Sequence, residues 1–243
     1  MKWMISGEED GFMKYRNLSH RTTLLALIVL ASMGSGALAQ VEYKAPDAGI
    51  PELFTLMGEF VRIAYNNEGY VSLGYRQANR SAGDEFMLLE IGATVRDGVD
   101  AYDLKREHLS IDTPDGKTIP LATVQEYHAG NLQALERAAN AIRDSINYFP
   151  PKATRACRIG FFAPLTSRAL AYDQVELSDR NACVGRLFFK VPGGIQYGQQ
   201  WLNVQFKDSL VKVPFRNYTE EEEKKFRGSW KDIKKEHEKR FKK

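Results

Sequence analysis

Apolar and polar residues alternate along most of the chain, in short blocks separated by turn-forming residues. A period of two is typical of strands with one buried face. Within residues 201–206, Leu202, Val204 and Phe206 share one face, while polar residues and a tryptophan share the other. On this basis we predict strands over residues 52–64, 69–76, 86–96, 104–111, 119–127, 157–162, 174–177, 184–191, 201–206 and 210–215.

Turn-forming residues join these predicted strands at short intervals. Asn66-Asn67-Glu68-Gly69 predicts a hairpin, and the Pro and Asp-Gly residues of 112–116 predict a tight turn. Many short strands at this spacing indicate a mainly β protein. We therefore expect an immunoglobulin-like antiparallel β-sandwich over residues 40–218, with one inserted helix and a C-terminal amphipathic helix.

The inserted helix is expected at about residues 129–147. Apolar residues recur there at steps of three and four, the spacing of one helix face, at Leu132, Leu135, Ala139, Ile142 and Ile146. Pro150-Pro151 would end it. A helix between two strand-rich halves is expected to cap one end of a sheet.

Residues 219–243 are expected to form the second, charged helix. Thr219 and Glu222 have the spacing of a capping box, and acidic residues at the start suit the helix dipole. Phe226, Trp230 and Ile233 share one face. This stripe either packs back on the sandwich or binds a partner protein of the cell envelope. Contact with an anionic membrane surface is a further alternative.

The N-terminal region has the pattern of a secretory signal peptide over residues 1–39. An apolar block at residues 22–31 follows several basic residues and precedes small residues that end in Ala37-Leu38-Ala39. Cleavage is expected after Ala39, from a start at Met1 or Met13. The predicted location is therefore periplasmic or secreted, and about 200 residues remain, enough for one large or two small domains.

The two cysteines, Cys157 and Cys183, both belong to the predicted mature chain. An exported protein meets an oxidising compartment in which a pair of thiols tends to close. We therefore predict a Cys157–Cys183 disulfide. A redox or metal-binding dithiol is the alternative, but the sequence lacks the C-x-x-C spacing of such sites.

The charge balance limits the kinds of partner. The chain has 34 Lys and Arg residues against 31 Asp and Glu residues, and residues 219–243 hold 10 of the former and 7 of the latter. The basic excess therefore lies largely in the tail, and the body gives no indication of a nucleic-acid groove. The predicted mature chain contains no apolar run long enough to span a membrane.

Motifs for catalysis and cofactor binding are missing from the sequence. Gly116-Lys117-Thr118 resembles the end of a phosphate-binding loop, but Ile111 stands where that loop has a glycine. We therefore predict no cofactor, metal or catalytic residue. The alternative is an envelope hydrolase or metal-dependent enzyme, whose site would use Asp97, Asp103, His108 and Asp112.

Aromatic pairs cluster around the predicted disulfide. They include Phe161-Phe162 and Phe188-Phe189, with Tyr197 and Trp201 nearby. Consecutive residues of a strand point to opposite faces, so one member of each pair is expected outside the sandwich core. Packing against the inserted helix would explain these outer rings, and a ligand or partner patch is the alternative.

Four segments together show a resemblance to a known family. They are FMLLEIGATVRDG, LKREHLSIDTPDGKTIPL, ACVGRLFFKVPGG and WLNVQFKDSLVKVPF. In this order they resemble secreted bacterial telokin-like, immunoglobulin-type β-sandwich domains of unknown function. The resemblance covers about residues 70–216, and the inserted helix departs from it. It implies a fold and an extracytoplasmic location, and it supplies no catalytic residues.

These observations favour an exported, non-enzymatic binding or scaffolding module of the bacterial cell envelope. The predicted partner is an envelope protein that contacts the C-terminal helix through Phe226, Trp230 and Ile233. The enzyme described above is the alternative, from a different class of function.

Overall fold

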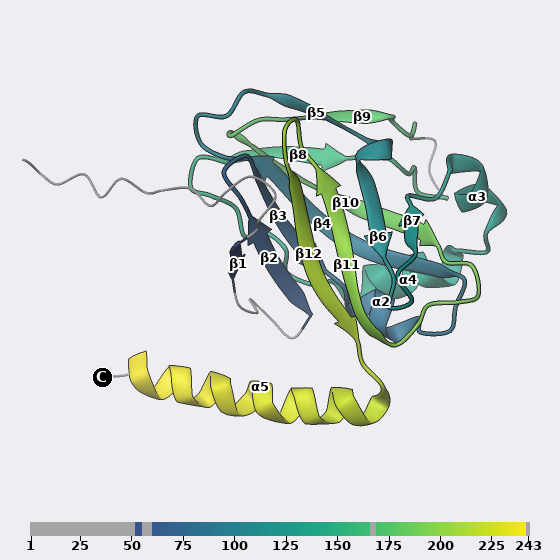
Figure 1. Ribbon diagram of the computed structural model, residues 1–243, viewed down its shortest axis with the longest axis vertical. Coiled ribbons are helices and arrows are strands. Elements are labelled where there is room, and N and C mark those ends of the chain that lie inside the picture. The colour runs from purple at the N-terminus through teal and green to yellow at the C-terminus, as the bar shows by residue number, and fades with distance from the viewer. Residues whose placement is uncertain (1–51, 55–59, 166–168, 242–243) are drawn as a thin grey trace, which may run out of the picture. The chain divides into compact units, whose positions relative to one another are not determined.

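The computed structural model describes residues 52–54, 60–165 and 169–241, all of which belong to one unit, Ala45–Lys243 (Figure 1). In α5 (Glu220–Phe241) it describes few side chains beyond Ser229. The predicted signal peptide lies outside the described residues. Among the helices that are described, none is long and apolar enough to span a membrane.

The largest sheet has six strands in the order β1-β2-β3-β4-β10-β8. Their bounds are β1 Glu52–Phe54, β2 Val61–Tyr65, β3 Gly69–Gly74, β4 Phe86–Val95, β10 Asn181–Lys190 and β8 Arg155–Ile159. All neighbours pair antiparallel except β8, which runs parallel to β10. The predicted hairpin joins β2 to β3, and the Asn66 N–H donates to the Gly69 carbonyl at 3.0 Å.

A second, antiparallel sheet has the order β12-β11-β6-β7, and β5 pairs with β9 in a short third sheet. Their bounds are β12 Leu210–Asn217, β11 Gly198–Gln205, β6 Leu109–Asp112, β7 Thr118–Pro120, β5 Tyr102–Lys105 and β9 Gln174–Leu177. The remaining elements are α2 Arg76–Arg80, the 3-10 turn η1 Arg106–His108, α3 Val124–Ala129 and α4 Gln133–Ala141.

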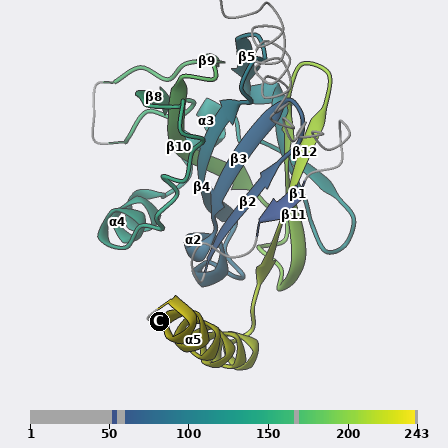
Figure 2. The ribbon, with the colours of Figure 1, turned by 90° about the vertical axis from the view of Figure 1, so that its left-hand side faces the viewer.

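The two larger sheets enclose the core. Leu202 and Val204 of β11 are fully buried, as their alternation predicts. Figure 2 shows the six-stranded sheet between α4 on one side and β11 and β12 on the other. Gly69 allows a close approach between the sheets, because a Cβ there would lie 2.2 Å from Cε2 of Phe206. All ten residues of β4 are buried, since both faces of this strand are covered.

The predicted mainly β fold with antiparallel sheets is confirmed. Four local predictions are wrong. Residues 52–64 do not form one strand, because β1 and β2 pair with each other as antiparallel neighbours. Residues 104–111 are divided among β5, η1 and β6, and β5 and β6 belong to different sheets. Residues 119–127 do not form one strand, because Thr123 and Glu126 form a capping box that starts α3. The helix expected over residues 129–147 is limited to α4, because α3 ends at Ala129 and the chain after Ala141 contains no further helical turns up to Pro150.

The structure joins Cys157 of β8 to Cys183 of β10 in a disulfide. The two residues are partners in the parallel register, so the bond links the edge strand to its neighbour. A disulfide of this kind is consistent with the oxidising compartment that the leader sequence predicts.

Candidate ligand-binding cavity

Each of the four residues of the predicted enzyme site contacts a different neighbouring residue in the structure. Asp97 forms an ion pair with Lys152, and Asp103 accepts a hydrogen bond from Gln174 at 3.4 Å. Asp112 lies 3.0 Å from Nζ of Lys212 and accepts from the Thr118 hydroxyl at 2.8 Å. The described residues contain no group of three or more His, Cys, Asp or Glu side chains arranged for a metal ion.

The fourth residue, His108, stabilises the turn at η1. Its Nδ1 accepts a hydrogen bond from the Lys105 N–H at 3.1 Å, and its ring stacks on Tyr102 with centroids 5.6 Å apart. Burial lowers the pKa of His108; the nearby Glu107 carboxylate opposes this shift, and the Lys105 cation adds to it. These contacts require an unprotonated Nδ1, so the turn favours neutral histidine.

We expect the stability of the protein to fall as the pH drops below the ordinary histidine pKa of about 6.5. The unfolded chain then binds a proton that His108 in the folded chain resists. His108→Asn keeps an acceptor for the Lys105 N–H but does not titrate. Urea unfolding should show that the free energy of unfolding falls more from pH 7 to pH 5 in the wild type than in His108→Asn. The difference between the two proteins should be less than about 1 kcal/mol, because the ring is partly exposed. Equal losses in the two proteins would contradict this.

One residue of the predicted partner-binding stripe, Phe226, packs against the body of the protein. The ring of Phe226 stacks on Tyr218 at 4.8 Å and meets the buried ring of Phe60 at 6.1 Å. Glu223 accepts a hydrogen bond from Asn79 at 2.9 Å, which ties the first turn of α5 to α2. Phe226 is therefore a packing residue. The side chains of Trp230 and Ile233 lie outside the described part of the structure.

A cavity of about 570 Å³ lies on the outer face of the six-stranded sheet, beside α4. This volume is in the range of pockets that hold small organic ligands. Its lining residues come from β4, β8, β10, α3, α4 and the segments that follow α4 and β8. Phe162 and Phe188 belong to this lining, and they come from the aromatic pairs for which the sequence left a ligand patch open as an alternative.

The floor of the cavity holds an ion pair between a buried carboxylate and a partly exposed arginine. Glu90 of β4 and Arg186 of β10 are cross-strand partners, and their charged groups lie 3.6 Å apart. Arg186 also donates to the Ala139 carbonyl at 3.1 Å and to Oδ1 of Asn140 at 3.0 Å. Burial raises the pKa of Glu90, while the Asp144 N–H and the Arg186 charge oppose the shift. Arg186 thus holds the end of α4 over the sheet.

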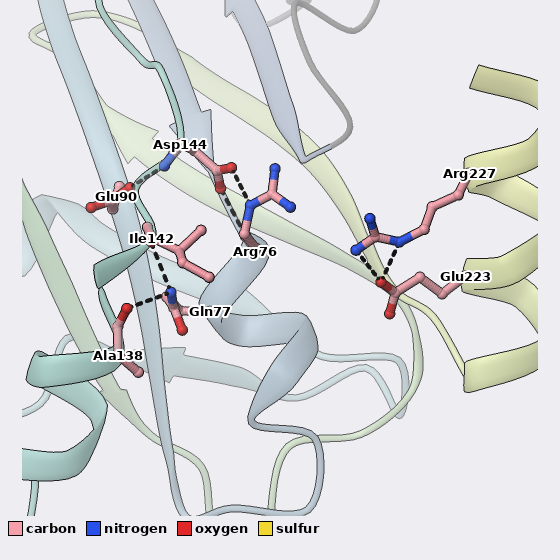
Figure 3. Close-up of polar contacts among 8 residues, drawn as sticks. All are labelled: Arg76, Gln77, Glu90, Ala138, Ile142, Asp144, Glu223 and Arg227. Carbon is pink, nitrogen blue, oxygen red and sulfur yellow. Dashed lines mark hydrogen bonds and ion pairs between the residues drawn. The ribbon is translucent and has the colours of Figure 1, made fainter. Parts of the chain in front are cut away.

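One wall of the cavity is the segment of residues 142–149, here called the strap. Asp144 forms an ion pair with Arg76 at 2.8 Å, and its N–H donates to Glu90 at 3.0 Å. Gln77 donates to the carbonyls of Ala138 and Ile142 at 3.3 and 3.0 Å. Figure 3 shows these contacts converging from β4 and α2 on the start of the strap. Burial raises the pKa of Asp144, and Arg76 opposes this effect.

Small residues of the sheet let the strap lie directly on β3 and β4. The Ser72 hydroxyl donates to the Ile146 carbonyl at 2.8 Å. A Cβ on Gly92 would lie 2.3 Å from Oγ of Ser72 and 2.9 Å from Cζ of Phe149. The backbone of the strap therefore bonds to the sheet, which explains why the helical spacing of its apolar residues does not produce a helix.

An aromatic cluster forms another part of the lining. The ring of Tyr127 lies 4.9 Å from that of Phe162 and 4.8 Å from that of Phe188, and all three rings are buried. The Tyr127 hydroxyl donates to the Glu136 carboxylate. Burial raises the pKa of Tyr127, and Glu136 adds to the shift. Phe188 therefore packs against α3, which precedes the predicted inserted helix, and the three rings line the cavity.

The sequence carried one signal of this site that motif searches miss. Glu90 is a single carboxylate within the otherwise uncharged strand FMLLEIGATV. A charge in a fully buried strand needs a partner, and burial without one is costly. Its partner, Arg186, is also the one charged residue between apolar neighbours in VGRLFF. Such isolated charges in apolar strands mark a polar patch on a covered sheet face.

A scan against protein-family models finds no match, and searches of curated proteins and of solved structures find no match either. The resemblance to telokin-like, immunoglobulin-type domains therefore stays a prediction from the sequence pattern.

Proposed function

We propose that the protein is an exported, non-enzymatic binding module of the bacterial cell envelope. Its body is an immunoglobulin-like β-sandwich, and the cavity beside α4 is its ligand-binding site. The leader pattern of residues 1–39 and the Cys157–Cys183 disulfide support export.

The observation that carries this proposal is the chemistry of the cavity lining. Among its described residues there is no serine, threonine, cysteine, lysine or histidine, the side chains that supply most nucleophiles and many bases. Glu90 faces Arg186 and accepts the Asp144 N–H, and Glu136 accepts the Tyr127 hydroxyl. A lining of this kind can position a bound molecule, while the carboxylates of Glu90 and Glu136 stay engaged with other protein groups.

The test uses protein recovered from the envelope fraction of cells that express the full chain. N-terminal sequencing should show cleavage after Ala39. A thermal-shift screen of small molecules should identify stabilising ligands in the wild type and lose them in Val184→Trp, which fills the cavity. Gln199→Trp, on the exposed side of β11, is the matched control and should keep them.

Two results would overturn the proposal. One is a cytoplasmic protein with an uncleaved leader. The other is a metal-dependent hydrolytic activity that His108→Ala removes, which would favour the enzyme alternative around Asp97, Asp103 and Asp112.

We propose further that α5 beyond Arg227 binds an envelope protein. The contacts of α5 with the body include those of Glu223 and Phe226, and Arg227 lies over the ring of Phe60 at 5.7 Å. These residues occupy the first two turns of the helix. The following residues carry Trp230 and Ile233 among many lysines, a composition that suits an acidic, partly apolar partner surface.

Two truncations should separate packing from partner binding. Ending the chain after Arg227 keeps Phe226 on Phe60, so the free energy of unfolding should stay within about 0.5 kcal/mol of the wild type. Ending it after Tyr218 exposes Phe60 and should lower that free energy by about 1–2 kcal/mol. Urea unfolding measures both, and affinity capture from envelope extracts should lose the partner in both. Unfolding of the longer truncation product would assign the whole of α5 to the body and contradict the proposal.

A further inference from the structure

We infer that the cavity binds a small organic anion, in which an aromatic body carries one carboxylate or phosphate group. Arg143 and Arg158 would contact the anionic group, and the aromatic wall would contact the ring. This inference rests on the proposed function, because it names the ligand class of the same cavity.

The two arginines are exposed and line the cavity. Arg143 lies two residues beyond the end of α4, and Arg158 lies on β8. Arg143 donates to Oδ1 of Asn140 at 3.0 Å. In the described part of the chain, no carboxylate forms an ion pair with either arginine. A guanidinium group presents a planar set of donors that matches carboxylate and phosphate oxygens.

The charges around the cavity leave one positive charge in excess. The lining residues include three arginines and three carboxylates. Glu90 is paired with Arg186 and also interacts electrostatically with Arg143. Asp144 is paired with Arg76, which lies outside the lining, and Glu136 accepts the Tyr127 hydroxyl. With Arg76 counted, four cations face three carboxylates, and an anionic ligand would balance the excess.

The apolar part of the lining suits an aromatic ring. The buried rings of Phe162 and Phe188 lie 5.1 Å apart and line the same cavity as the two arginines, together with Ile159 and Val184. Aromatic rings favour stacked or edge-on contact with another ring. A volume of about 570 Å³ holds a single-ring compound with its anionic group. The lining therefore fits an aromatic acid better than an inorganic ion.

The test is a ligand titration of the full mature protein, in which calorimetry and amide NMR shifts measure binding. The probes are benzoate, phenyl phosphate and the neutral benzamide. Arg143→Gln and Arg158→Gln should each weaken anion binding about tenfold or more and leave benzamide unaffected. Arg137→Gln on α4 and Arg155→Gln on β8 remove the same charge at exposed positions outside the lining, and they should change binding less than about twofold.

The probes also separate the outcomes. The tighter of benzoate and phenyl phosphate identifies the anionic group. If benzoate and benzamide bind equally, and Val184→Trp blocks both, the anion inference fails and the proposed binding function stands. If the control arginine variants weaken binding as much as the cavity variants, the effect is one of net charge and the inference fails. If no probe binds, the inference is overturned, and the screen described above then decides the proposed function separately.

Discussion

Replacing Cys157 and Cys183 together by alanine is expected to lower the free energy of unfolding by about 3–4 kcal/mol. The bond joins residues 26 positions apart, and closing a loop of this length restricts the unfolded chain. It also attaches β8, the edge strand, to β10. Without the bond, β8 is held by its five parallel residue pairs and the contacts of Ile159. Urea unfolding of the double variant under oxidising conditions measures the change.

The reduced wild type is the control for this result. Its free energy of unfolding in the presence of dithiothreitol should match that of the double variant, because both lack the covalent link. Mass spectrometry of native material should show the bond before reduction. An unchanged stability in the double variant, or free thiols in native protein, would contradict the expectation.

Arg106→Met is expected to lower the free energy of unfolding by about 2–5 kcal/mol. The guanidinium of Arg106 donates to the carbonyls of Phe161 and Ala122, two buried residues on separate segments. It also lies over the ring of Phe162 at 4.6 Å. A buried acceptor left without a donor costs about 1–3 kcal/mol, and methionine keeps the apolar stem but makes neither bond.

The matched control for this variant is Arg155→Met, at an exposed position of β8, which should change stability by less than about 0.5 kcal/mol. Arg106→Lys restores the charge but not the forked pair of donors, so it should fall between the wild type and Arg106→Met. Urea unfolding compares all four proteins. If Arg106→Lys and Arg106→Met are both as stable as the wild type, the two carbonyls have other donors and the expectation is wrong.

Most strands follow from the sequence because burial of one face imposes a period of two. Strand β12 shows this directly, because its residues alternate between partly exposed and buried from Leu210 to Asn217. The strap shows the limit of such reasoning. Its apolar residues have helical spacing, but the carbonyl of Ile146 bonds to Ser72, and the N–H of Asp144 bonds to Glu90. Hydrogen bonds to distant strands take the place of the local hydrogen bonds that a helix needs. The sequence around the strap does not reveal these distant partners.

The candidate site was less predictable for a related reason. Sequence analysis grouped Asp97, Asp103 and His108 because they are neighbours along the chain, yet each has a separate local partner. The cavity instead gathers charges from distant segments, with Glu90 and Arg186 about one hundred positions apart. The disulfide was predictable because two cysteines allow a single pairing.

The pairing of β4 with β10 has a consequence for how the chain matures. β4 ends at Val95 and β10 begins at Asn181. At a synthesis rate of about 5–20 residues per second, the ribosome completes β4 roughly 4–17 seconds before its neighbour exists. During that interval a ten-residue apolar strand has one open edge, which is a template for aggregation. The nascent chain would therefore benefit from a holding chaperone until β10 has been synthesised, and the same delay would keep it unfolded for the export proposed above.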